Sequence, residues 1–294
     1  MPRAAHEIGK DEEGRTVKSI VLKEMRLSRG LYSSLKFRSG ILLDGAPAHA
    51  DQRVKPGQIL EAVWEEESGY RVLDESPIPL FVPFEDDHYL IVDKPAPLPT
   101  LSSPKQAGPT LESALYAHWG CPRNYIFRPV NRLDKGTSGL MAVAKNAHAQ
   151  HLLQRQLHTA SFVREYLAIC EGRLPDRYGV IDRPIGKLNE IERGVMENGV
   201  RAVTHYQVEM EKNDLSLVRL RLETGRTHQI RVHMKHMGCP IVGDYLYGKA
   251  DGRLNGRFAL HACRIAFSHP LTGEAICLQS ELPPELKEIW DFAK

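Results

Sequence analysis

The sequence predicts an α+β protein with a mixed, mainly antiparallel sheet, preceded by a small α+β N-terminal module. Strand candidates in the second half of the chain follow one another in pairs, with a turn signal at residues 212–214. This order is typical of a meander and not of a doubly wound parallel sheet, in which strands and helices alternate. Three prolines at positions 77, 79 and 83 indicate a linker between the two parts. We therefore expect a polar tail at 1–14, a small module at 15–67, a linker at 68–82 and the main domain at 83–294.

The N-terminal module is expected to contain one helix followed by short strands. Ser28 is a plausible N-cap for a helix over 27–40, and Gly40 is a natural residue to end it. Asp44-Gly45 predicts a hairpin turn, and Pro56-Gly57 a turn into a short strand.

The main domain is expected to hold seven strands and three helices. The strand candidates are 88–93, 140–144, 165–170, 202–211, 215–223, 258–267 and 275–279. Helices are expected at 110–117, 147–159 and 227–237, the last one ended by Gly238 and Pro240.

Composition excludes several classes of protein. The 294 residues are 42% hydrophobic and 26% charged, which is ordinary for a soluble globular chain and not for a collagenous or wholly disordered one. No apolar run approaches the ~20 residues that a membrane span needs, and the polar start does not resemble a signal peptide. The five cysteines form no C-x-x-C pair, so we expect reduced thiols and a cytoplasmic location, without a membrane partner.

The formal net charge of +2 conceals an uneven distribution. Nine basic and three acidic residues give +6 between Arg15 and Gln58, whereas ten acidic residues and one arginine give −9 between Ile59 and Asp93. The rest of the chain, from Lys94 on, carries +7. The basic segment, with Lys36 and Arg38 as candidate contacts, is expected to bind nucleic acid, although windows of this size also fluctuate by several charges.

The first chemically informative run is NRLDKGTSG, residues 131–139. A carboxylate, Asp134, lies between cations in a loop that leads into an apolar strand, so it can serve as an ionised nucleophile or base. The alternative is an ordinary Asx turn with exposed charges. The run has neither the order of a P-loop nor that of a nucleophile elbow.

The second run is GRTHQIRVHMKHMG, residues 225–238, at the start of an expected helix. Arg226 and Arg231 are suited to pair with a carboxylate or a phosphate. The histidines at 228, 233 and 236 are five and three residues apart with no acid between them, whereas zincin-type pairs are four apart with a glutamate. We therefore expect no metal and disfavour a metal-dependent hydrolase.

The third run, REYLAI, residues 164–169, is on its own a strand start, and Tyr166 a core-edge tyrosine. Together the three runs resemble the catalytic aspartate, tyrosine and C-terminal arginine blocks of the RluA-type pseudouridine synthases, in the family's order. DDHYLIVDKPAPLPT resembles the family's opening strand and lysine-proline turn. The likeness extends from about Pro83 to the C-terminus, and the basic segment more loosely resembles the alpha-L RNA-binding module that often precedes this domain.

The resemblance implies a role for individual residues. It makes Asp134 the essential carboxylate, Tyr166 the residue that stacks on the flipped base, and Arg231 the partner of the aspartate. Arg132 matches an arginine thought to enter the RNA stack where the uridine leaves. Asn131 departs from the histidine that is usual in the family, and the LPTLSS run departs from its usual valine-histidine. We also count Arg226, His228 and Gln229 of the arginine block as candidate substrate-binding residues.

The implied reaction converts uridine in structured RNA to pseudouridine and needs no cofactor. The carboxylate either attacks C1′ or removes a sugar proton, and both routes stay open. Ribosomal RNA is the first expected substrate and transfer RNA the second, with the protein acting as a monomer. A non-catalytic RNA-binding or ribosome-assembly factor, favoured by the basic segment alone, is the competing interpretation.

Overall fold

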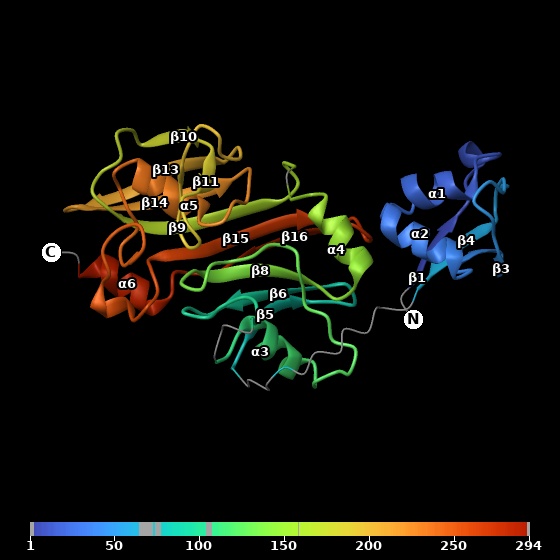
Figure 1. Cartoon of the computed structure of the whole chain (residues 1–294), viewed down its shortest axis with the longest axis horizontal. Coiled ribbons are helices and arrows are strands. Elements are labelled where there is room, and N and C mark those ends of the chain that lie inside the picture. Colours follow the sequence, from blue (N-terminus) through green and yellow to red (C-terminus); the bar gives the residue numbers. More distant parts are fainter. Residues whose placement is uncertain (1–2, 65–72, 74–77, 104–107, 158, 293–294) are drawn as a thin grey trace.

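A computed structural model describes residues 3–64, 73, 78–103, 108–157 and 159–292. A four-stranded and a ten-stranded sheet organise the described part of the chain, and the four-stranded one, with its two helices, lies at one end of the molecule (Figure 1). Most of the expected linker lies outside the described residues. The domain boundaries therefore stay a prediction.

The N-terminal sheet has the strand order β1-β4-β2-β3. Its strands are β1 (Arg3–Glu7), β2 (Ile41–Leu43), β3 (Ala46–Pro47) and β4 (Ile59–Val63), and its helices are α1 (Val17–Lys23) and α2 (Arg29–Phe37), with a short 3-10 turn at Lys10–Glu12. Apolar side chains of both helices and three of the strands form a separate core. A small hydrophobic core of its own is what permits such a segment to hold its shape.

Two details of the N-terminal part differ from the expectation. Arg3–Glu7, which we expected in a polar tail, pairs with β4 as a strand, because Ile8 enters the core and the Glu12 carboxylate bonds both His6 and the Gly9 amide. Helix α2 is capped by Ser28 as predicted, but the residue that leaves it with positive φ is Ser39 (φ 52°), not Gly40.

The large sheet has ten strands, and its main path runs β10-β13-β14-β9-β15-β8-β6-β5. The strands are β5 (Phe81–Glu85), β6 (Tyr89–Lys94), β7 (Arg128–Pro129), β8 (Ser138–Ala144), β9 (Val163–Glu171), β10 (Tyr178–Asp182), β13 (Val203–Lys212), β14 (Leu215–Leu222), β15 (Leu260–Ser268) and β16 (Ala275–Gln279). A separate hairpin joins β11 (Ile185–Lys187) to β12 (Arg193–Val195). All pairings are antiparallel except that of β8 with β15, which confirms the mixed, mainly antiparallel sheet.

The parallel pairing of β8 with β15 lies where the NRLDKGTSG loop enters β8. Gly139 lies opposite Ala262 and has φ +108°. A Cβ atom at this position would overlap the carbonyl oxygen of Ala262, so only glycine permits this approach. The end of the loop is thereby held against β15.

The helices of the large domain are α3 (Leu111–His118), α4 (Ala147–Gln154), α5 (Gln229–His236) and α6 (Pro284–Asp291). Helix α5 ends near Gly238 (φ 74°), as predicted. Helix α4 is shorter than the expected 147–159, because the amides of Gln156 and Thr159 bond carbonyls three residues back. None of the helices in the described part of the chain has the length and apolarity that spanning a bilayer requires.

Candidate active site

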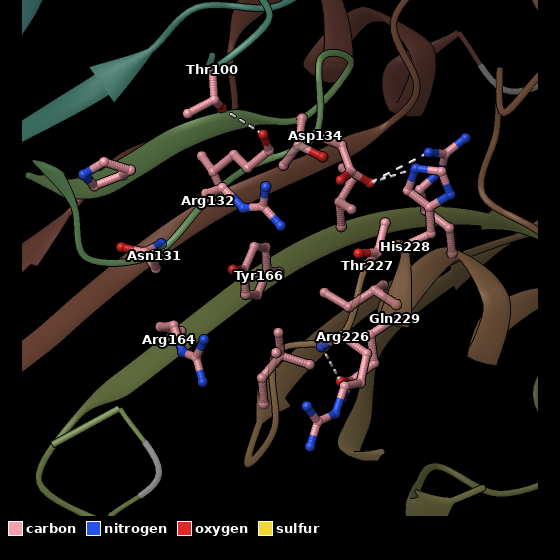
Figure 2. A pocket seen from close by; sticks show the side chains of 18 of the residues that line it. Thr100, Asn131, Arg132, Asp134, Arg164, Tyr166, Arg226, Thr227, His228 and Gln229 are labelled. Atoms are coloured by element: carbon pink, nitrogen blue, oxygen red, sulfur yellow. Dashed lines mark hydrogen bonds and ion pairs between the residues drawn. The ribbon is translucent and has the colours of Figure 1, made fainter. Parts of the chain in front are cut away.

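One pocket of about 550 Å³ opens where the NRLDKGTSG loop, β9 and the loop before α5 meet (Figure 2). Its polar and charged lining includes Thr100, Asn131, Arg132, Asp134, Lys135, Arg164, Tyr166, Arg226, Thr227, His228, Gln229 and Arg231. Segments nearly 100 residues apart in the sequence therefore form one concave site. Such convergence of polar groups in a cleft is typical of an active site.

The loop that presents Asp134 runs from β7 to β8. Its turn is closed by the backbone, since the Thr137 amide donates to the carbonyl of Asp134 at 3.1 Å. The hydroxyl of Thr100 donates to the carbonyl of Leu133 at 2.7 Å and holds the loop from the other side. Among the described residues, the Asp134 carboxylate bonds Arg231 and no backbone amide of the turn, and it lines the pocket.

The Asp134 carboxylate lies 3.3 Å from Nη1 of Arg231, as the resemblance implied. Arg231 is 4% exposed and is held in place by Asp244, which accepts from Nε at 2.7 Å and from Nη2 at 2.8 Å. The guanidinium also lies 4.2 Å from the ring centre of Phe258 and 4.9 Å from that of Tyr247. Burial works to lower the pKa of Arg231, but hydrogen bonds and charge from Asp244, and then from Asp134, outweigh it and raise that pKa. Arg231 is thus a fixed cation beside the one pocket carboxylate among the described residues.

His228 precedes α5 as its N-cap residue and has a left-handed φ of 58°. Its Nδ1 bonds the Tyr247 hydroxyl at 2.8 Å, and its Nε2 lies 4.0 Å from Oδ2 of Asp134. Burial lowers the pKa of His228, which Asp134 offsets only in part. The imidazole therefore faces the carboxylate as a neutral ring at pH 7.

Tyr166 lies on the pocket face of β9 and is 5% exposed. Burial raises the pKa of its hydroxyl, Arg164 lowers it in part, and Asp134 raises it further. The hydroxyl is therefore protonated near neutral pH, and the ring offers a flat surface beside Asp134 (Figure 2).

Arg132 and Arg226 line the pocket with exposed side chains. Gln229 differs from them because it is 3% exposed and its amide is fully engaged: Oε1 accepts from Thr224 and from the Arg226 amide, and Nε2 donates to Val203 and Thr204. Its hydrogen-bonding capacity is used to shape the loop that carries Arg226.

Asn131, where the family usually has histidine, is buried at the edge of the pocket. Its Oδ1 accepts from the Ala142 amide at 3.0 Å, next to the Val130–Ala142 backbone bond. The residue therefore extends the attachment of the NRLDKGTSG loop to β8.

Lys36 and Arg38 are exposed at the end of α2 and do not belong to the described lining of this pocket. The histidines of the second run also do not converge: His233 is buried against Thr204 and the carbonyl of Arg183. Over the described residues, His, Cys, Asp and Glu side chains form no group of three or more suited to a metal ion.

Sequence reasoning missed three charged residues at the site. Asp244 is fully buried and holds Arg231. Lys94, also fully buried, donates through Nζ to the carbonyls of Leu98 and Pro95 at 2.7 and 3.1 Å, and burial lowers its pKa to about 7, partly offset by Asp134. Arg164 lies on the pocket wall. A charged residue inside an apolar stretch is the signal by which Asp244 and Lys94 were detectable.

Comparison with known proteins places these features in context. Residues 88–236 match the family described as RNA pseudouridylate synthase. An uncharacterized RNA pseudouridine synthase of Bacillus subtilis (YjbO) is 34% identical over 270 residues, 90% of this chain and 95% of the relative. Ribosomal large subunit pseudouridine synthase D of Nitrosomonas europaea is 37% identical, over 84% of this chain and 74% of the relative. The solved structure of human RNA pseudouridylate synthase domain containing 1 aligns with a TM-score of 0.56 and 27% identity, over 71% of this chain and 86% of that one.

Proposed function

Because the chain belongs to the RNA pseudouridylate synthase family and isomerises uridine in RNA to pseudouridine, we propose that Asp134 is the carboxylate on which this reaction depends. One observation carries the proposal: the Asp134 carboxylate lies in an open pocket, 3.3 Å from a buried arginine, with the ring of Tyr166 on the neighbouring wall. The reaction breaks the N1–C1′ bond and joins C5 to C1′. The proton lost from C5 is balanced by the one gained at N1, so no redox partner is required.

Asp134 acts at the sugar end of the target nucleotide. An ionised carboxylate there either attacks C1′ and displaces the base, or removes a sugar proton to release it. Arg231 neutralises the carboxylate in a site that the bound RNA closes to water, where electrostatic interactions are strongest. Both routes need the same pair of residues.

Tyr166 and Arg132 act on the base and on the RNA stack. The uridine must leave the stack to reach a concave pocket, which costs a few kcal/mol and least in loops and bulges. We propose that uracil stacks on the Tyr166 ring, and that the exposed Arg132 side chain occupies the space that the base leaves. The protonated Tyr166 hydroxyl is suited to help move the C5 proton. His228 and Arg226 are the remaining candidate contacts, whereas we assign Gln229 to shaping the loop.

The proposed substrate is large-subunit ribosomal RNA, a choice supported by the names of several relatives that are 35–37% identical to this chain. We further propose that residues 15–67, together with strand β1, form an RNA-binding module, with Lys36 and Arg38 exposed on it, and that 83–294 form the catalytic domain. We also propose that the protein acts as a monomer, and ribosomal RNA as the proposed substrate supports a cytoplasmic location.

Pseudouridine mapping of total RNA from cells with and without the gene tests the substrate. We expect one or more sites in large-subunit ribosomal RNA to disappear with the gene. Loss of sites in transfer RNA alone would replace the proposed substrate and leave the role of Asp134 intact. Purified protein acting on a transcript that contains the mapped site then shows whether the chain suffices.

A further inference from the structure

Arg164 is a buried guanidinium without a counter-ion on the wall of the candidate active site. The residue is 6% exposed. Its Nη2 donates to the Leu157 carbonyl at 3.2 Å, and its guanidinium carbon lies 5.9 Å from the ring centre of Phe162. Nε is buried with no hydrogen-bond partner, and within the described chain no carboxylate pairs with this arginine. A buried charge is costly unless it is paired, so this arrangement points to an anion that arrives with a ligand.

Arg164 faces the same side of β9 as Tyr166. Burial alternates along the start of this strand, and residues 164 and 166 occupy the same buried face. Both line the pocket, with Arg164 on the side of Tyr166 away from Asp134 (Figure 2). The charge of Arg164 also lowers the pKa of the Tyr166 hydroxyl against the larger effect of burial. A ligand that stacks on Tyr166 therefore passes next to the guanidinium.

Gly225 leaves one side of the guanidinium uncovered. A Cβ atom at position 225 would lie 3.0 Å from Nη1 of Arg164, closer than a side chain is normally accommodated. The backbone of Gly225 does not have the positive φ that favours glycine. The close approach of Arg164 is therefore the structural feature that favours glycine at this position. The space above Gly225 gives an acceptor oxygen access to Nη1.

The charge of the pocket identifies the class of ligand. Among the described lining residues, five are cationic and one is a carboxylate: Arg132, Lys135, Arg164, Arg226 and Arg231 against Asp134. Arg231 is already neutralised by its two aspartates, which leaves the others facing the ligand. Uracil is neutral, so the anion that an RNA strand brings to this wall is a phosphodiester, which arginine binds through charge-assisted N–H donors.

We propose that Arg164 binds a phosphodiester of the RNA strand next to the flipped uridine, with Nη1, beside Gly225, donating to a non-bridging oxygen. This inference rests on the proposed function, since it requires an RNA strand in the pocket. It assigns a binding role to the arginine of the REYLAI run and a reason for the glycine that opens the GRTHQIR run.

The test measures how RNA affinity depends on salt. Full-length wild type, Arg164→Gln and Arg264→Gln are titrated with a large-subunit ribosomal RNA transcript between about 50 and 200 mM salt. Log affinity falls as log salt rises, and removing one phosphate contact makes this negative slope shallower by about 0.7 to 0.9. We expect this smaller salt dependence in Arg164→Gln. Arg264 is the matched control, because it pairs with Glu165 on the other face of β9 at 3.0 Å, and its variant keeps the wild-type slope.

A role confined to packing predicts a different result. Arg164→Gln would then lose thermal stability or affinity but keep the wild-type slope, and this result overturns the proposal. If Arg164→Gln does not fold, Gly225→Ala decides, because it keeps every charge while its Cβ covers Nη1. We expect the same reduced salt dependence in Gly225→Ala. If this variant keeps the wild-type affinity and the wild-type slope, the inference is overturned.

Pseudouridine formation by the same preparations tests the proposed function separately from the phosphate site. Non-specific binding also follows the salt law, so the slope is measurable whether or not the transcript holds the target uridine. An unchanged slope in Arg164→Gln beside active wild type refutes the phosphate site alone. Wild type that neither binds this RNA nor forms pseudouridine on the mapped substrate refutes the proposed function and the inference together.

Discussion

Replacing Asp244 by asparagine tests whether the buried arginine is positioned by a second carboxylate. Asp244 is fully buried, and its Oδ1 accepts from Nη2 of Arg231 and from the amides of Leu246 and Tyr247, while Oδ2 accepts from Nε of Arg231 at 2.7 Å. Asparagine retains the Oδ1 acceptor but places an NH₂ donor opposite the Nε–H donor. The variant therefore loses one charge-assisted hydrogen bond and the neutralising charge of a buried arginine.

The expected loss is large because the pair is buried. Removing one partner of a buried ion pair costs about 3–5 kcal/mol, and we expect Asp244→Asn to lower the free energy of unfolding by about 3 kcal/mol. The rings of Phe258 and Tyr247 still hold Arg231 in part, which places the value at the lower end of the range. A displacement of Arg231 from Asp134 on the order of 1 Å is expected to lower kcat about 100-fold.

Urea unfolding followed by tryptophan fluorescence measures the first effect, and tritium release from RNA containing [5-³H]uridine measures the second. Asp251→Asn is the matched control, because Asp251 pairs with the exposed Arg253 at 2.6 Å and such surface pairs contribute at most about 1 kcal/mol. Wild-type stability and rate in Asp244→Asn would refute the reasoning, since Asp134 alone would then suffice to hold Arg231.

Three further predictions concern other parts of the molecule. Deleting the residues before Ile78 is expected to weaken RNA binding while the remaining domain keeps its cooperative unfolding; a deletion protein that binds as tightly as full length contradicts this. Tyr166→Phe is expected to keep RNA affinity within about twofold and to lower kcat about 100-fold, as loss of proton transfer by a hydroxyl does, and an unchanged kcat would remove that role. Burial, with charge from His151 and His88, lowers the pKa of His148 from 6.5 to about 4. Between these two pH values the imidazole is protonated in the unfolded chain but neutral in the folded protein, so the free energy of unfolding falls as the pH drops from 6.5 to 4. Relative to His148→Phe, wild type should lose about 3 kcal/mol of unfolding free energy between pH 6.5 and 4, and parallel pH profiles of the two proteins would contradict the assignment.

Sequence patterns predicted the helices and strands that depend on local features such as alternating hydrophobicity and helix caps. The alternating segments at 202–211 and 215–223 form β13 and β14 within a residue or two of their predicted ends, and the Ser28 cap starts α2. Elements with weaker patterns were missed. Strand β1 alternates only between exposed and half-buried side chains, and α1 is a helix of seven residues.

The site was predictable only where distant runs were considered together. Asp134 and Arg231 are 97 residues apart, so no local pattern pairs them, and their meeting followed from the resemblance. Asp244 stands out in the sequence only as a charge inside an apolar stretch, and Arg164 does not stand out. What distinguishes both is burial: Asp244 neutralises Arg231, and Arg164 has no counter-ion among the described residues. Burial of a charge depends on how the sheet and loops pack, which the sequence does not display.

The role of Asp134 is tested most directly by Asp134→Asn in the purified full-length protein. Tritium release and pseudouridine content are measured on the RNA identified by mapping, together with RNA affinity and thermal stability. Because the variant keeps the shape of the side chain and loses the carboxylate, we expect folding and RNA binding near wild type and a rate reduced at least about 1000-fold. A folded Asp134→Asn protein that forms pseudouridine at the wild-type rate would show that this carboxylate does not carry the reaction.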